Sequence, residues 1–169
     1  MSVDVRVEDG VDCSLDPRLL ETFLEDALET LGRSGCDVSV LLCNDDTIRP
    51  LNRTWRGKDS PTDVLSFPQH EFQRPDELNG DTGAGGPPVL LGDVVLSLQT
   101  ARRQAGELGH DLSSEVRVLL IHGLCHLLGW DHEEPSDAKA MRAAETRVLS
   151  ALDSTTVSLV ARAHGPESG

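Results

Sequence analysis

The chain has 169 residues, of which 38% are hydrophobic and 26% charged, and its formal net charge at pH 7 is -14. This size and composition are typical of one globular domain, and the acidic charge excludes a generic nucleic-acid binder, whose affinity for phosphates comes mainly from Lys and Arg. The sequence has no apolar run long enough for a membrane span and no basic and apolar leader, so we expect a cytoplasmic protein.

The N-terminal part of the chain predicts a strand, a helix and a second strand. Residues 3–7 alternate valine with polar residues, which is the period of a half-buried strand. Asp16 and Pro17 form a favourable helix start, an apolar stripe follows them, and Gly32 is placed to end the helix. Residues 38–43 form a short apolar run, as in a buried strand. We expect the two strands to pair in parallel across a right-handed crossover.

A second helix and two more strands are predicted next. The helix covers about residues 47–55 and requires Pro50 to lie in its first turn, where a missing backbone donor is tolerated. Residues 64–67 and 94–96 predict a third and a fourth strand. The stretch 69–88 between them is rich in Gly and Pro, so we expect a flexible loop. Strands joined by a loop without a helix pair most easily antiparallel.

Three helices are predicted in the rest of the chain. The first covers about residues 98–108 and the second about 113–128. Apolar side chains surround almost the whole circumference of the second helix, which indicates a position in the core. The last helix begins at about 135 and has an apolar stripe as far as 152. We expect one domain over residues 1–152 and a frayed tail over 153–169.

Three histidines near the end of the buried helix predict a metal site. His122 and His126 are four positions apart, so on a helix both rings project from one face. Gly129 can end the helix in the left-handed conformation, and the reversal would bring His132 back towards the same point. Three histidine ligands with an open fourth position are typical of a catalytic zinc site. We therefore expect one Zn²⁺ per chain on His122, His126 and His132, held by a zincin-like metal helix.

The same histidine spacing occurs in the metzincin peptidases, which leaves a second interpretation open. In those enzymes the residue after the first histidine is the glutamate that serves as general base, whereas here it is Gly123. The missing carboxylate disfavours a peptidase. Cys125 lies close to the histidine face, where a contact with the metal is an alternative to core packing, the commoner role of a free cysteine. The four cysteines form no C-x-x-C pair, so we expect all of them to be reduced.

A basic segment interrupts the otherwise acidic sequence. Residues 49–58 contain Arg49, Arg53, Arg56 and Lys58 and no acidic residue, which predicts a locally basic surface. By itself, Arg56 is most simply a solvated charge at a helix end.

Several segments resemble the YbeY family of bacterial rRNA maturation factors, and along the chain they occur in the same order as in that family. They are the histidine motif 122–132, Leu51-Asn52 with Arg56-Gly57-Lys58-Asp59, the strand Thr62-Asp63-Val64-Leu65-Ser66-Phe67-Pro68, and Leu91-Gly92-Asp93. The resemblance covers about residues 38–149. It implies a single α+β domain with a four-stranded mixed, mostly parallel sheet, about five helices and a zinc ion on the three histidines.

The resemblance also implies an activity and its partners. It implies a zinc-dependent endoribonuclease that cuts single-stranded rRNA in 16S 3′-end maturation and ribosome quality control, together with the small ribosomal subunit and its proteins. Arg56 matches an arginine that the family needs for activity, so Arg56 and His122 are the candidate catalytic residues. The sequence departs from the family at Cys125, where leucine is usual, at Pro50, and in the longer glycine-rich loop 79–88.

Two rival functions remain at this level. One is a zinc hydrolase of the peptidase type, and the other is a non-catalytic ribosome-assembly factor whose zinc is structural. The attacking nucleophile on RNA is either a metal-activated water or the 2′-hydroxyl. Asp131 is a candidate partner that orients a histidine or caps the helix. The oligomeric state is not indicated by any pattern in the sequence.

Overall fold

The computed structural model describes residues 3–69, 89–130 and 134–153. In chain order the elements are β1 (Val3–Val7), α1 (Pro17–Thr30), β2 (Asp37–Cys43), α2 (Asp45–Arg56), β3 (Val64–Pro68), β4 (Leu90–Ser97), α3 (Leu98–Leu108), α4 (Leu112–Leu127) and α5 (Pro135–Leu152). The loop predicted over 69–88 and the tail predicted over 153–169 fall almost entirely outside the described residues. No helix in the described ranges is both long and apolar enough to cross a membrane.

The four strands form one sheet in the order β1-β2-β4-β3. β1 pairs with β2, and β2 with β4, in parallel, while β3 runs antiparallel to β4. The parallel pairing of β1 with β2 and the antiparallel pairing of β3 with β4 follow the predictions, since a helix joins β1 to β2 and no helix is predicted between β3 and β4. The expected α+β domain with a mixed, mostly parallel sheet and five helices is confirmed within the described part of the chain.

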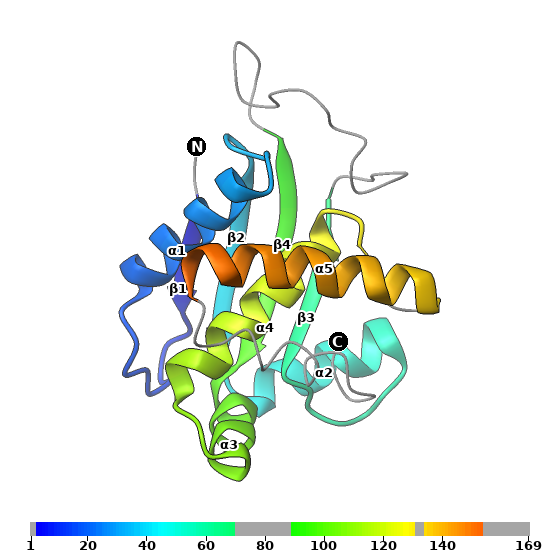
Figure 1. Ribbon diagram of the computed structural model, residues 1–169. Coiled ribbons are helices and arrows are strands. Elements are labelled where there is room, and N and C mark those ends of the chain that lie inside the picture. The colour runs from blue at the N-terminus through cyan, green and yellow to red at the C-terminus, as the bar shows by residue number, and fades with distance from the viewer. Residues whose placement is uncertain (1–2, 70–88, 131–133, 154–169) are drawn as a thin grey trace.

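The two faces of the sheet have separate apolar clusters. α1, α4 and α5 lie over one face (Figure 1), and the large core there receives alternate strand residues such as Val38, Val40 and Val94. The residues between them point the other way, as period-two alternation requires. Val95 and Leu65 form a smaller cluster with Cys43 at the end of β2 and Ile48 of α2. α4 is therefore enclosed by the core, whereas α2 covers the opposite face only in part.

Two predicted boundaries are corrected by the structure. α2 begins at Asp45, two residues before the predicted start, so Pro50 lies inside the helix and not in its first turn. The amide that Pro50 lacks would have bonded the carbonyl of Asp46, and both residues are exposed, so water can satisfy that carbonyl. β4 begins at Leu90, four residues before the predicted strand, because the positive φ of Gly92 and a register shift against β2 interrupt the apolar alternation.

The remaining helix ends agree with their sequence signals. The side chain of Asp16 accepts a hydrogen bond from the Arg18 amide, and that of Ser97 accepts one from the Thr100 amide.

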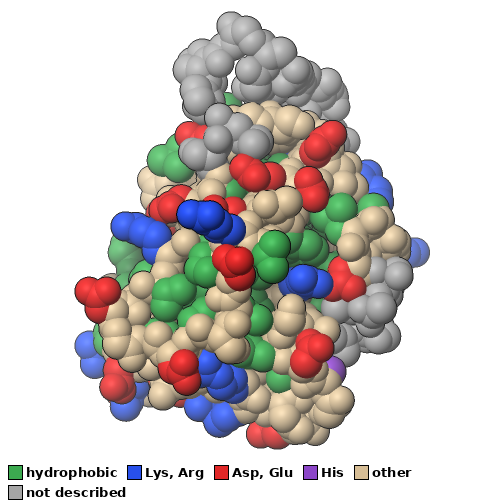
Figure 2. All heavy atoms as spheres, turned by 90° about the vertical axis from the view of Figure 1, so that its left-hand side faces the viewer, with side chains coloured by type: hydrophobic (Ala, Val, Ile, Leu, Met, Phe, Trp, Pro, Cys, Tyr) green, Lys and Arg blue, Asp and Glu red, His purple; other side chains and the backbone are tan. Residues whose placement is uncertain are grey.

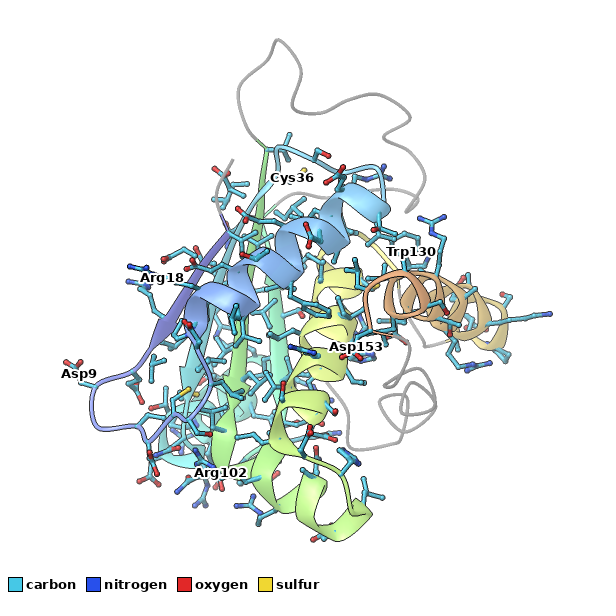
Figure 3. All side chains as sticks on the ribbon, turned by 60° about the vertical axis from the view of Figure 1, so that its left-hand side comes forward. Asp9, Arg18, Cys36, Arg102, Trp130 and Asp153 are labelled. Atoms are coloured by element: carbon cyan, nitrogen blue, oxygen red, sulfur yellow. The ribbon has the colours of Figure 1, made fainter. Side chains whose placement is uncertain are left out.

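At the other end of the chain, Asp153 lies beside α4, where its carboxylate is 2.9 Å from the guanidinium of Arg117 (Figure 3). All four cysteines are free thiols, as predicted.

The side of the molecule that carries β1 and α1 has a mixed surface (Figure 2). Acidic and basic side chains are interspersed there around apolar patches, with no broad field of one sign. The net acidity is therefore not concentrated on this side.

Candidate metal centre

α4 places two of the three predicted histidines side by side. The ring centroids of His122 and His126 are 4.7 Å apart and their planes meet at 88°. His122 is fully buried and His126 partly exposed. The spacing of four residues produces this arrangement, because side chains at i and i+4 share one helix face.

The end of α4 reverses the chain as the sequence predicts. Gly129 has a φ of +100°, and its amide donates to the carbonyl of His126 at 3.1 Å. The amide of Trp130 donates to the carbonyl of Cys125 at 3.0 Å, which completes the pair of hydrogen bonds of a Schellman motif. Trp130 lies where the chain leaves α4 (Figure 3).

His132 and Asp131 lie outside the described residues, so the structure does not place them. Within the described ranges, no three His, Cys, Asp or Glu side chains gather closely enough to hold a metal ion. Two of the three predicted ligands are thus brought together. Cys125 is fully buried and belongs to the main apolar core.

A buried carboxylate stands directly behind His122. Glu145 of α5 is 2% exposed, and its Oε1 lies 2.7 Å from Nδ1 of His122. A carboxylate at this distance accepts the proton of Nδ1, which leaves Nε2 as the basic ring nitrogen. Histidines that bind metals usually donate their other ring N–H to an acceptor such as a carboxylate, as His122 does here. The donor chemistry of the pair therefore fits a zinc ion.

Sequence reasoning missed Glu145, although the sequence holds a signal for it. The apolar stripe of α5 consists of the buried residues Met141, Ala144, Val148 and Leu149, and position 145 falls on the same face. An acidic residue on a buried stripe requires a partner, because an unpaired charge in the core is costly. That requirement predicts a buried basic group opposite α5.

Gly123 lets α4 rest closely on the sheet. A Cβ at this position would lie 3.0 Å from Cγ1 of Val94 and 3.2 Å from Oγ of Ser66. The hydroxyl of Ser66 donates to the carbonyl of Gly123 at 2.9 Å. The position that holds the general base in metzincins is therefore packed against β3 and β4, and a side chain there would require Val94 and Ser66 to shift.

Two further carboxyl groups are buried near α4. Asp63 precedes β3 and is 1% exposed, and its Oδ1 accepts a hydrogen bond from the Val64 amide at 2.7 Å. Burial raises the pKa of Asp63, because removal from water disfavours its charged form. Glu115 is fully buried, and its Oε1 lies 2.6 Å from Nε2 of His110. Sequence reasoning names Asp63 only within the segment 62–68 and does not name Glu115, because each looks like an ordinary surface acid.

Arg56 and His126 line the same cleft. Its volume is about 780 Å³, within the range of small-molecule sites. Arg56 ends α2, and the left-handed Gly57 follows it. Trp55 of α2 and Phe67 of β3 also line this cleft. Arg56 in addition reaches a second, more polar pocket of about 450 Å³.

The predicted basic surface is divided by the fold. Nε of Arg49 donates to Oδ1 of Asp59 at 3.0 Å, and both side chains are more than half exposed. Lys58 lines the second pocket, whereas Arg56 lines both. Among these basic residues, Arg56 is the one that the structure brings into the cleft of His126.

Comparison with known proteins identifies the relatives of this chain. The family model described as "Endoribonuclease YbeY" matches residues 8–153. The chain belongs to the endoribonuclease YbeY family. The relative named "Endoribonuclease YbeY" from Myxococcus xanthus is 52% identical over 133 residues, which are 78% of this chain and 42% of that protein. The one from Salinispora tropica is 38% identical over 156 residues, which are 92% of this chain and 98% of the relative.

The fold also resembles a solved structure. The solution structure of TM1509 from Thermotoga maritima matches with a TM-score of 0.55 and 24% identity, and the match covers 93% of this chain and 95% of that one. This likeness concerns the fold. In this YbeY-family chain the fold places the histidine pair, Glu145 and Arg56 around one end of α4 and the adjoining cleft.

Proposed function

We propose that this chain is a zinc-dependent endoribonuclease that cuts single-stranded rRNA, in 16S 3′-end maturation and ribosome quality control. The observation that carries the proposal is the histidine pair in a chain of the endoribonuclease YbeY family: a buried carboxylate backs His122, and His126 shares a cleft with Arg56. The proposed partners are the RNA strand and the small ribosomal subunit with its proteins, which places the activity in the cytoplasm.

The proposed ligands of one zinc ion are His122, His126 and His132. Zinc in such a site supplies a bound water with a pKa of about 7 and a positive charge for a phosphoryl oxygen. Glu145 accepts the Nδ1 proton of His122, which would leave Nε2 as the nitrogen that holds the ion. Because this hydrogen bond is fully buried, water does not compete for it and the ring orientation is fixed.

Arg56 is proposed to bind the phosphodiester that is cut. Negative charge grows on the phosphoryl oxygens during cleavage, whether water or the 2′-hydroxyl attacks. A planar guanidinium donates two parallel hydrogen bonds to such oxygens and stabilises the transition state more than the ground state. The partly exposed position of Arg56 in the cleft of His126 is suited to this role.

The rival peptidase is disfavoured by the packing of Gly123. A metzincin-like general base would need a side chain where Val94 and Ser66 already lie within 3.2 Å of the first added carbon. Among the described residues that line the His126 cleft, Asp93 of β4 is the one with a carboxylate.

The deciding experiment combines metal analysis with RNA cleavage. We expect about one zinc per chain in the purified protein and cleavage of a single-stranded rRNA fragment that a chelator stops and added zinc restores. His126→Ala should lose both zinc and cleavage. A protein that binds zinc and folds but leaves the RNA intact would support the non-catalytic assembly factor instead.

A further inference from the structure

Trp55 has an unusual position for the largest apolar side chain. It is 68% exposed. Four large apolar side chains are exposed in the described ranges, and Trp55 is the aromatic residue among them. Ile48, Leu51 and Asn52 form an inward-facing stripe of α2, and Trp55 continues its i, i+3, i+4, i+7 spacing. The stripe faces the sheet at its beginning and the cleft at its end, so Trp55 borders the cleft while most of its surface stays open to solvent.

Phe67 supports the indole from the strand below. The ring centroids of Trp55 and Phe67 are 6.0 Å apart at an interplanar angle of 74°, which is an edge-to-face contact. Phe67 is itself partly buried against the small cluster under α2. One contact thus holds the indole in place while most of its surface remains accessible.

The surroundings of Trp55 are suited to a nucleic acid. The cleft is lined by the cations Arg6 and Arg56 and the uncharged polar side chains Ser39 and Gln69, with Asp93 as its acidic residue in the described ranges. Aromatic rings beside cations along a groove are the means by which proteins hold single strands, since each base offers a flat face and each linkage a negative charge. The sequence has five aromatic residues, and among those in the described ranges Trp55 and Phe67 line this cleft.

We propose that Trp55, supported by Phe67, is a stacking platform for an unpaired nucleobase of the RNA strand that is cut. This inference rests on the proposed function and adds a binding subsite to it. With the phosphodiester at Arg56, the neighbouring residue of α2 holds a base next to it. A base in a duplex already has both faces stacked, so the platform favours single strands over duplexes.

The test uses Trp55 as its own reporter. Trp55 and Trp130 are the two tryptophans of the sequence, so Trp130→Phe leaves Trp55 as the source of indole fluorescence. Rapid mixing with a short oligouridylate, before cleavage proceeds, should quench this fluorescence, and a duplex of equal length should quench it much less. Absence of quenching by the single strand would overturn the proposal.

Affinity measurements separate stacking from charge. Trp55→Ala should weaken oligouridylate binding about 5- to 100-fold, and Trp55→Phe should recover part of the loss because it keeps an aromatic face. A ribose-phosphate oligomer without bases should bind wild type and Trp55→Ala equally. Leu19→Ala is the matched control, since Leu19 is 64% exposed on α1 and lies outside the cleft.

The outcomes distinguish this inference from the proposed function. If the RNA binds through Trp55 but is not cut, the stacking platform stands and the endonuclease proposal fails. If Trp55→Ala binds oligouridylate as tightly as wild type, or loses equal affinity for the oligomer without bases, the platform is wrong, even where cleavage is normal. A defect confined to binding of a ribosomal protein would also overturn it and make Trp55 a protein contact.

Discussion

The two faces of the sheet differ in their access to water, and the parts of the proposed site are divided between them. On the face of α4 and α5, His122 and Glu145 meet in a dry core. On the face of α2, Trp55 and Arg56 border an open cleft. In the proposed site, the closed face would hold His122 in place, and the open cleft, which His126 of α4 also lines, would receive the RNA.

The largest expected effect is that of removing Arg56, which tests the open face separately from the closed one. We expect Arg56→Ala to lower the single-turnover cleavage rate by about 10²-fold or more, because it removes one preorganised group that stabilises developing charge. Zinc content and melting temperature should stay at wild-type values, since the side chain lies on the open face. Arg56→Lys should recover part of the rate, because the ammonium keeps the charge and loses the planar fork.

The control for Arg56 is Arg18→Ala, which removes an exposed cation from α1 on the other side of the sheet (Figure 3). Its cleavage rate should equal that of wild type. Loss of zinc or of the folded state in Arg56→Ala would show that Arg56 has a structural role and would break the comparison.

On the closed face, Glu145→Gln should weaken zinc binding by about 10- to 100-fold. Loss of a carboxylate that orients a metal-binding histidine has effects of this size. Competition with a chromophoric chelator measures the affinity directly. The control Glu29→Gln changes an exposed acid of α1 and should leave the affinity unchanged. Equal zinc affinity in Glu145→Gln and wild type would remove Glu145 from the metal site.

Close packing of α4 on the sheet gives a third prediction. Gly123→Ala should lower the free energy of unfolding by about 1–3 kcal/mol, because the added carbon is only 3.0 Å from Cγ1 of Val94. Gly106→Ala is the matched control, since Gly106 is an exposed residue of α3 with nothing within 4 Å of an added Cβ. That change should stabilise the protein by about 0.5–1 kcal/mol. Denaturant titration of both variants measures the contrast, and destabilisation of equal size in both would contradict it.

The smallest expected effect concerns Asp45, which ties the start of α2 to α3. Its Oδ1 accepts hydrogen bonds of 2.7 Å from the hydroxyls of Ser97 and Thr100, and its Oδ2 accepts one from Arg103. Burial by itself raises the pKa of Asp45, but these hydrogen bonds and the charge of Arg103 outweigh burial and hold the pKa below its ordinary value. Asp45→Asn should therefore cost about 1 kcal/mol at pH 7.

The pH dependence of this cost has a definite sign. A carboxyl group whose pKa is lower in the folded state stabilises the protein above its unfolded pKa of about 3.9 and loses that contribution as the pH falls through the folded value. The difference in stability between wild type and Asp45→Asn should thus be constant near neutral pH and shrink below about pH 4. Asp4→Asn, in an exposed pair with Arg6, should change stability little at any pH. A difference between wild type and Asp45→Asn that persists at low pH would contradict the assignment.

Local signals predicted most of the fold. The helix starts at Asp16 and Ser97 depend on short-range hydrogen bonds from the side chain to the next amides, and the helix end at Gly129 depends on a backbone conformation that glycine adopts freely. Such interactions involve residues close in sequence and can be predicted from it. The sequence prediction starts α2 two residues too late because it places Pro50 in the first turn, which the exposed side of the helix does not require.

The sequence by itself determined the pair of histidines on one helix face, the reversal after them, and the order of strands and helices that makes the sheet mostly parallel. Tertiary structure decided which acid meets His122, since Glu145 comes from another helix 23 residues away and is selected by packing. It also decided that Gly123 is a contact with the sheet, that Arg49 pairs with Asp59, and that Arg56 and Trp55 share a cleft with His126. Each of these depends on distances between elements, which the periodicity of a single element does not contain.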